Sequence, residues 1–240
     1  MGVYLKGVEV ALRGLPTTLY VSLFAVAGGV VIGLLLAVMK LGKSKPAKIV
    51  SDVYIEVMRA TPMLAQALIM AYGLPMILQS NGVDFKWPSL VIPAIIVCAF
   101  NSAAYVAEIL RSGIQAVDPG QIEAAYSLGM SKGMVNKLVV WPQALRICIP
   151  ALGNELVTMI KETSVLGFVG VVEVIRSAQL WNAQSFETFP AYVGAAIVYL
   201  IVCFPLSKLV GLLEKKMDED GTNDVKNDRK LFAKAEKSDK

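Results

Sequence analysis

The sequence predicts an all-α integral membrane protein with five transmembrane helices and a two-helix cytoplasmic loop. Hydrophobic residues make up 55% of the 240 residues, more than an ordinary soluble domain contains. Four or five apolar stretches are long enough for a helix that crosses a bilayer, which needs roughly 20 residues. A long polar segment with helix signals separates the third and fourth stretches.

The predicted spans lie at 15–40, 50–79, 88–111, 148–172 and 190–213. The first is the clearest, because residues 19–39 carry no charge. It is too long for a cleavable signal sequence, and no small-residue cleavage site follows it, so we expect it to remain in the mature protein. We predict a transmembrane domain over residues 1–215 and a charged, disordered cytoplasmic tail over 216–240.

Basic residues predict the orientation, because cytoplasmic loops carry an excess of lysine and arginine. In a five-span topology, 17 of the 23 basic residues lie on one side, in the loops after the first and third spans and in the tail from Lys208. This predicts an outside N-terminus and a cytoplasmic C-terminus. It also accounts for the net charge of +4 without nucleic-acid binding.

Small residues and prolines mark special positions in the first two spans. Glycines in the first span favour close helix packing over a role in lining a pore: Gly28, Gly29 and Gly33. Residues in the second span are expected to kink or break its helix: Pro62, Gly73 and Pro75. Broken helices within membranes usually border a cavity.

The polar segment between the third and fourth spans carries the signals of two short helices. Asp118 is placed to cap the first helix, with Pro119 in its first turn and Gly129 at its end. A second helix over 131–140 is expected to stop at Pro142. An amphipathic helix lying on anionic lipid is the alternative interpretation of this segment.

Ionisable residues inside spans are costly in lipid and mark candidate functional groups. Lys161 lies deep in the fourth span and needs a counter-charge from Glu155, Glu162 or a ligand carboxylate. Three spans each present one polar face: Asp52, Glu56, Arg59 and Gln66; Asn101, Tyr105, Glu108 and Ser112; and Asn154, Glu155, Thr158, Lys161 and Glu162. These faces either hold the bundle together, with Glu56 and Arg59 as an i, i+3 ion pair, or bind a substrate.

A zwitterionic amino acid would suit such faces, because both of its fixed charges can be matched. Asn101 and Glu155 would meet its ammonium group, and Lys161 its carboxylate. The chemistry of a membrane enzyme is not indicated, since the chain has no histidine to serve as a general base. Its three cysteines have no metal-ligand spacing and suggest no disulfide framework.

Residues 123–142, which begin Glu-Ala-Ala, resemble the EAA motif of ATP-binding-cassette importer permeases, a loop that docks into a cleft on the ATPase subunit. Other segments resemble the polar amino-acid uptake family, the histidine/glutamine-type permeases: 56–62, 72–75, 101–105 with Glu108 and Arg111, 142–144 and 161–164. The resemblance covers about residues 10–215. Trp141 replaces a usual leucine and Ala60 a usual glycine, and neither change removes a charge or a required turn.

The resemblance implies a type I ABC importer permease in a bacterial inner membrane, with an EAA coupling loop at about 116–147. The implied partners are a second permease subunit, identical or related, two ATPase subunits and an extracytoplasmic amino-acid-binding protein. ATP and Mg would be bound by the ATPases, since this chain has no GxxxxGK[ST] loop. ATPase coupling is implied for Glu123, Ala124, Ala125 and Gly129. Substrate binding near the membrane midplane is implied for Thr61, Asn101, Tyr105, Glu155 and Lys161.

A passive channel or an ion-coupled carrier is the alternative function. In that case Glu108, Glu155, Lys161 and Glu162 would form an ion path, and no ATPase partner would be needed. That hypothesis does not account for the EAA segment. The amino acid itself stays open among basic residues, glutamine and cystine, whereas Glu155 would repel an acidic substrate.

Overall fold

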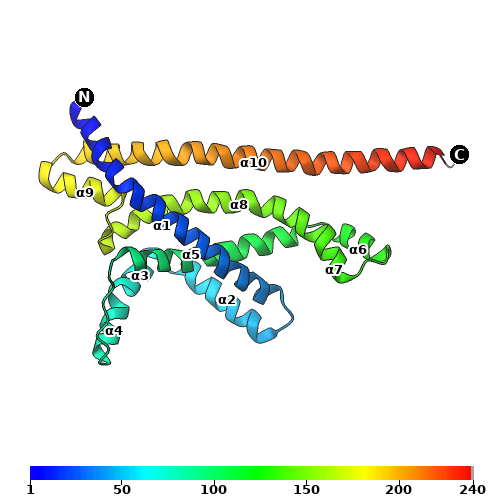
Figure 1. Cartoon of the computed structure of the whole chain (residues 1–240), viewed down its shortest axis with the longest axis horizontal. Helices are drawn as coiled ribbons and strands as arrows, with labels where there is room; N and C mark the ends of the chain where they lie inside the picture. Colours follow the sequence, from blue (N-terminus) through cyan, green and yellow to red (C-terminus); the bar gives the residue numbers. More distant parts are fainter. Residues whose placement is uncertain (239–240) are drawn as a thin grey trace.

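The computed structural model describes the backbone of residues 1–238 and the side chains of residues 1–217, and this part forms helices and turns without strands. Four long helices form the bundle: α1 (Gly2–Leu41), α5 (Val91–Gln115), α8 (Trp141–Glu162) and α10 (Thr188–Ser238). In Figure 1, α5, α8 and α10 lie side by side and α1 runs diagonally across them. The short helices α6 and α7 lie at one end of the bundle, and α9 lies at the other.

Helix α1 is longer than the span predicted at 15–40, because its helical backbone continues through Pro16 to Gly2. Its first turns pack against α9 (Val174–Ser185) and α10. A Cβ atom on Gly7 would collide with the backbone of Pro190, and one on Gly14 with the backbone of Glu173. Glycine at these positions therefore allows the helices to approach closely.

The glycines in the middle of α1 pack against α5, as the sequence predicts. A Cβ atom on Gly29 would lie 2.8 Å from the Cβ of Ser102, and one on Gly33 would lie 2.7 Å from the Cβ of Val106. Both distances are shorter than real Cβ contacts. The two backbones thus approach closely because the side chains are missing, which is how helices associate in lipid.

The second predicted span is interrupted, as expected from its prolines. It consists of α2 (Lys45–Ala60), α3 (Met63–Leu68), the π-helical turn η1 (Ile69–Gly73) and α4 (Leu74–Ser80). The chain is extended at Thr61 and Pro62, where α2 ends. The polar face expected across 52–66 is therefore divided, and Gln66 belongs to α3 rather than to the helix of Glu56 and Arg59.

The expectation that a helix over 131–140 stops at Pro142 is wrong. Helix α7 (Lys132–Val135) continues through a second π-helical turn, η2 (Asn136–Val140), into α8. The amide of Trp141 donates to the carbonyl of Asn136, five residues back. The wider π turn comes just before Pro142, which has no N–H to donate, so the hydrogen-bond spacing of the helix changes there and the helix does not end.

Four helical segments of the described chain are long and apolar enough to cross a membrane: Gly2–Leu41, Met63–Ser80, Val91–Gln115 and Thr188–Met217. Helix α8 is not among them, since it carries Arg146, Glu155, Lys161 and Glu162. It nevertheless packs between α5 and α10 as part of the bundle. The number of five membrane spans therefore stays a prediction.

The bundle is completed by η3 (Thr163–Val169) and α9, which follow α8. Glu173 caps α9 by accepting hydrogen bonds from the amides of Ile175 and Arg176. The three cysteines are buried free thiols. Most of the tail at 216–240 lies outside the residues whose side chains are described, so its disorder stays a prediction.

Candidate functional site

The break between α2 and α3 is stabilised by one side chain, that of Gln66. Pro62 has no N–H, so carbonyls at the end of α2 lose their helical partner. The Gln66 amide nitrogen lies 3.0 Å from the carbonyl oxygen of Met58, 3.2 Å from that of Thr61 and 2.7 Å from the Thr61 hydroxyl. Gln66 therefore supplies the donors that the proline removes.

Asn101 on α5 extends this hydrogen-bonded chain into the bundle. The residue is only 3% exposed, and its side-chain amide donates to the Gln66 carbonyl oxygen at 3.1 Å. Thr61, at the other end of the chain, is exposed and donates its hydroxyl proton to Val57 O at 2.7 Å. Two of the predicted site residues are thus joined, through a residue that was not among them.

Tyr105 lies one turn after Asn101 and contacts a cation. The guanidinium carbon of Arg59 is 5.4 Å from the centre of the Tyr105 ring, a cation–π distance. The expected ion pair between Glu56 and Arg59 is wrong, since no such pair exists within 4 Å among the described side chains. Arg59 contacts α5 rather than its own helix because Tyr105 lies within its reach.

Glu155 on α8 faces α5 and is 9% exposed. One carboxylate oxygen accepts a hydrogen bond from the Ser102 hydroxyl at 2.7 Å. No lysine or arginine among the described side chains lies within ion-pair distance of it. Ser102 directly follows Asn101 on α5, but consecutive side chains point about 100° apart, so Glu155 contacts a different face of α5 from the one that bonds Gln66. A buried carboxylate without a counter-ion is poised to accept a cationic group.

Lys161 contacts none of the other four predicted substrate-binding residues in the described structure. It is six residues from Glu155 on α8, which places it about 120° away around the helix. Its side chain is exposed and borders a pocket of about 450 Å³ with residues of η3, α9 and α10, among them Ser164, Tyr192 and Tyr199. Neither Glu155 nor Glu162 forms an ion pair with it in the described part of the chain.

Gln66 and Ser102 complete the arrangement and were not among the predicted substrate-binding residues, although the sequence placed Gln66 on a polar face. Gln66 lies four residues after Pro62, at the position where a helix broken by proline needs a donor. That spacing is a usable signal once the break is recognised. Ser102 had no comparable signal, because its role depends on α8 crossing α5 at that level.

The polar loop between α5 and α8 begins and ends its first helix as predicted. Asp118 caps α6 (Pro119–Ser127) by accepting from the amide of Gly120 at 2.8 Å. Gly129 has a φ angle of 79°, the left-handed conformation that ends a helix. The amides of Gly129 and Met130 donate to the carbonyls of Tyr126 and Ala125, which is the Schellman arrangement.

The loop carries its own small hydrophobic core. Glu123 and Ala124 are exposed, whereas Ala125 is buried. The core joins the loop to the ends of α5 and α8 and contains Ile114, Val117, Ile122, Ala125, Val135, Val140 and Ala144. Gln143 on α8 also donates to Gln121 on α6 at 2.6 Å. The loop is thus a packed unit attached to two long helices, with Glu123 and Ala124 available to a partner.

Among the described residues, no group of acidic or cysteine side chains is arranged to hold a metal ion. The polar groups at the α2–α3 break and along α5 and α8 are suited to binding and contain no reactive pair of nucleophile and base. Their arrangement fits recognition of a polar ligand rather than its chemical conversion.

The chain is similar to known membrane transport proteins. It is 36% identical over 205 residues to the "Putative glutamine transport system permease protein GlnP" of Rickettsia conorii, covering 85% of this chain and 91% of that protein. It is 33% identical over 206 residues to the "Arginine transport system permease protein ArtQ" of Bacillus subtilis, covering 86% and 91%.

A solved structure titled "Crystal structure of an amino acid ABC transporter with histidines" has the same fold, with a TM-score of 0.80 and 40% identity, over 88% of this chain and 96% of that one. Residues 29–219 match the family described as "Binding-protein-dependent transport system inner membrane component". The chain therefore belongs to this family of membrane permease subunits.

Proposed function

We propose that this chain is the permease subunit of an ATP-driven importer that moves a polar amino acid into the cytoplasm by alternating access. The observation that carries the proposal is the match to the permease family over residues 29–219, together with relatives named for glutamine and arginine transport. The 40% identical solved structure is titled as an amino acid ABC transporter, which supports the same substrate class.

The proposed assembly contains a second permease subunit, two ATPases that bind ATP and Mg, and an extracytoplasmic binding protein. The chain would cross the inner membrane several times, with its N-terminus outside and its C-terminus in the cytoplasm. This orientation is supported by the basic residues, 17 of 23 of which lie on the side of the α6–α7 loop in a five-span topology.

We assign ATPase coupling to the loop at 116–147. Glu123 and Ala124 are exposed for a partner, Ala125 anchors their helix in the loop core, and the left-handed Gly129 ends it. Because this core includes residues of α5 and α8, a force applied to the loop would move both helices. That is how closure of the ATPases would alter access to the site.

Substrate binding is assigned to the faces of α3, α5 and α8. Glu155 would bind the ammonium group, and the chain of Thr61, Gln66 and Asn101 would orient it. Tyr105 would border the side chain of the substrate. Lys161 would reach the carboxylate only in a conformation that differs from the one described, because it faces another pocket here.

The test is amino-acid-stimulated ATP hydrolysis and uptake in liposomes that hold this chain with its ATPase and binding protein, using L-glutamine and L-arginine as probes. Glu123→Lys should abolish stimulation, and Lys161→Ala should change its dependence on amino-acid concentration. Matched controls are Glu214→Lys and Lys208→Ala, at exposed positions on α10 away from both sites. Both controls should behave as wild type.

Uptake by the wild-type chain without an ATPase, insensitive to both Glu123→Lys and Lys161→Ala, would overturn the proposal. Such a result would favour the channel or ion-coupled carrier instead.

A further inference from the structure

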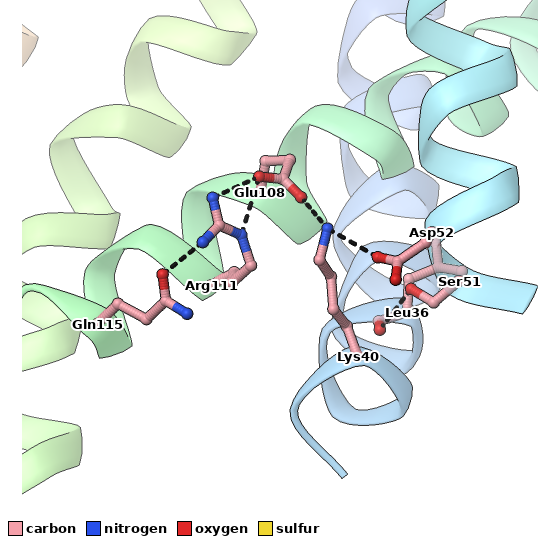
Figure 2. A network of polar contacts seen from close by, with 7 residues as sticks. All are labelled: Leu36, Lys40, Ser51, Asp52, Glu108, Arg111 and Gln115. Carbon is pink, nitrogen blue, oxygen red and sulfur yellow. Dashed lines mark hydrogen bonds and ion pairs between the residues drawn. The ribbon is translucent and has the colours of Figure 1, made fainter. Parts of the chain in front are cut away.

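A cluster of charged residues joins three helices at the end of the bundle that carries the coupling loop. Glu108 on α5 accepts from Lys40 of α1 at 2.6 Å with one oxygen, and from Arg111 at 2.8 and 2.9 Å with the other. Lys40 also pairs with Asp52 of α2 at 3.0 Å. Arg111 further donates to Gln115 on α5. In Figure 2 the Lys40 side chain points between the two carboxylates, and Glu108 lies between the two cations.

The cluster balances its own charge and is partly shielded from solvent. Two cations face two anions, and the side chains of Glu108 and Lys40 are 17% and 23% exposed. Lys40 is the member that joins α5 to α1 and α2. Partly buried, charge-assisted bonds of this kind are stronger than ion pairs on an open surface.

The position of the cluster relates it to the coupling loop. Arg111 lies one turn before Ile114, the α5 residue that packs into the core of the loop. Toward the middle of the bundle, α1 and α5 are already held together by apolar contacts around Leu36 and Ala103. The Ser51 hydroxyl of α2 also donates to Leu36 O of α1 at 2.9 Å. Lys40 therefore lies where α1 and α2 meet the end of α5 that the loop would move.

We propose that Lys40 is a positioning residue for energy coupling: by binding Glu108 and Asp52 together, it makes α1 and α2 move with the end of α5 that carries the coupling loop. The inference rests on the proposed function of the chain as an importer permease. Without Lys40, the loop would still bind and stimulate the ATPases, but its displacement would be transmitted less completely to α1 and α2. ATP hydrolysis would then continue with less transport.

The experiment compares uptake with ATP hydrolysis in the complete complex in liposomes, with the amino acid that the wild type imports, L-glutamine or L-arginine. Lys40→Met should retain stimulated hydrolysis within about twofold and lose about tenfold in uptake, so that more ATP is consumed per amino acid imported. Lys40→Arg keeps the charge and should restore the wild-type ratio. The control is Lys6→Met, which removes an exposed ion pair with Glu9 inside a single helix.

A Lys40→Met complex in which uptake and hydrolysis fall in proportion, or in which neither changes, would overturn the inference. If that variant does not assemble, Asp52→Asn decides the question by the same ratio, because it removes only the link to α2. An importing wild type with an unchanged ratio in the variants contradicts this inference alone. A wild type that shows no ATP-dependent uptake contradicts the proposed function itself.

Discussion

Two carboxylates contact side chains of α5, and they differ in whether a cation balances their charge: Glu108 of α5 itself and Glu155 of α8. Around Glu108, each carboxylate oxygen has a cation, and the cluster is electrically neutral. Around Glu155, the carboxylate has one serine hydroxyl and no cation within ion-pair distance in the described structure. A saturated cluster holds helices in place, whereas an unsaturated buried carboxylate keeps capacity for a ligand. Removing the charge should therefore have opposite consequences in the two regions.

The largest expected effect is the loss of transport caused by Glu155→Gln. The amide can still accept from Ser102 but no longer attracts an ammonium group, so uptake should fall about 10–100-fold, as expected from losing a charge-assisted bond of roughly 1.5–3 kcal/mol. Thermal stability should stay equal or rise, because a buried unpaired charge is removed. Liposome uptake and melting in detergent measure both. Glu187→Gln, exposed before α10, is the control, and a marked fall in Tm for Glu155→Gln would contradict the comparison.

The second-largest expected effect is the loss of stability caused by Glu108→Gln. It leaves Arg111 without an anion and Lys40 with Asp52 alone, so we expect a loss of about 2 kcal/mol, between the small cost at an exposed pair and the 3–5 kcal/mol of a buried one. Glu9→Gln is a close match, since Glu9 also accepts from a lysine and an arginine, but it is exposed and within one helix. Equal melting temperatures of the two variants would show that the cluster holds nothing together.

Gln66→Leu probes the hydrogen bonds that join Thr61, Gln66 and Asn101. It removes the donor that satisfies carbonyls at the α2–α3 break and a partner of Asn101, and should cost about 1–2 kcal/mol. The free energy of unfolding and the substrate concentration at half-maximal uptake should both be measured. Gln79→Leu loses one exposed hydrogen bond to Phe85 O and should change neither. An unaltered Gln66→Leu protein would mean that water replaces the glutamine at the break.

The smallest effect is expected for Arg111→Lys, which keeps the charge and loses the several hydrogen bonds of the guanidinium. We expect a cost below about 1 kcal/mol, because the Arg111 side chain is 29% exposed. Arg13→Lys is the control, since Arg13 contacts Glu9 through a single nitrogen at the exposed surface. A loss as large as that of Glu108→Gln would mean that hydrogen-bond geometry, rather than charge balance, stabilises the cluster.

The sequence alone indicated the features that depend on neighbours along the chain. Asp118 caps a helix because its side chain reaches an amide two residues away, and Gly129 ends that helix because its own φ angle is left-handed. Pro62 breaks α2 because it lacks an N–H. The helical membrane class follows from composition, and the family follows from ordered motifs. All of these depend on local geometry or on residue type.

Only the tertiary structure decided which polar groups meet. Lys40 and Glu108 are 68 residues apart, and Ser102 and Glu155 are 53 apart, so their pairing depends on the level at which helices cross. Arg59 contacts Tyr105 instead of Glu56 for the same reason, and the elements that pack beside Lys161 are η3, α9 and α10. Helical spacing indicates the face on which a side chain lies. The packing of glycine-rich surfaces sets how closely and at which register the helices cross, and thereby which faces come together.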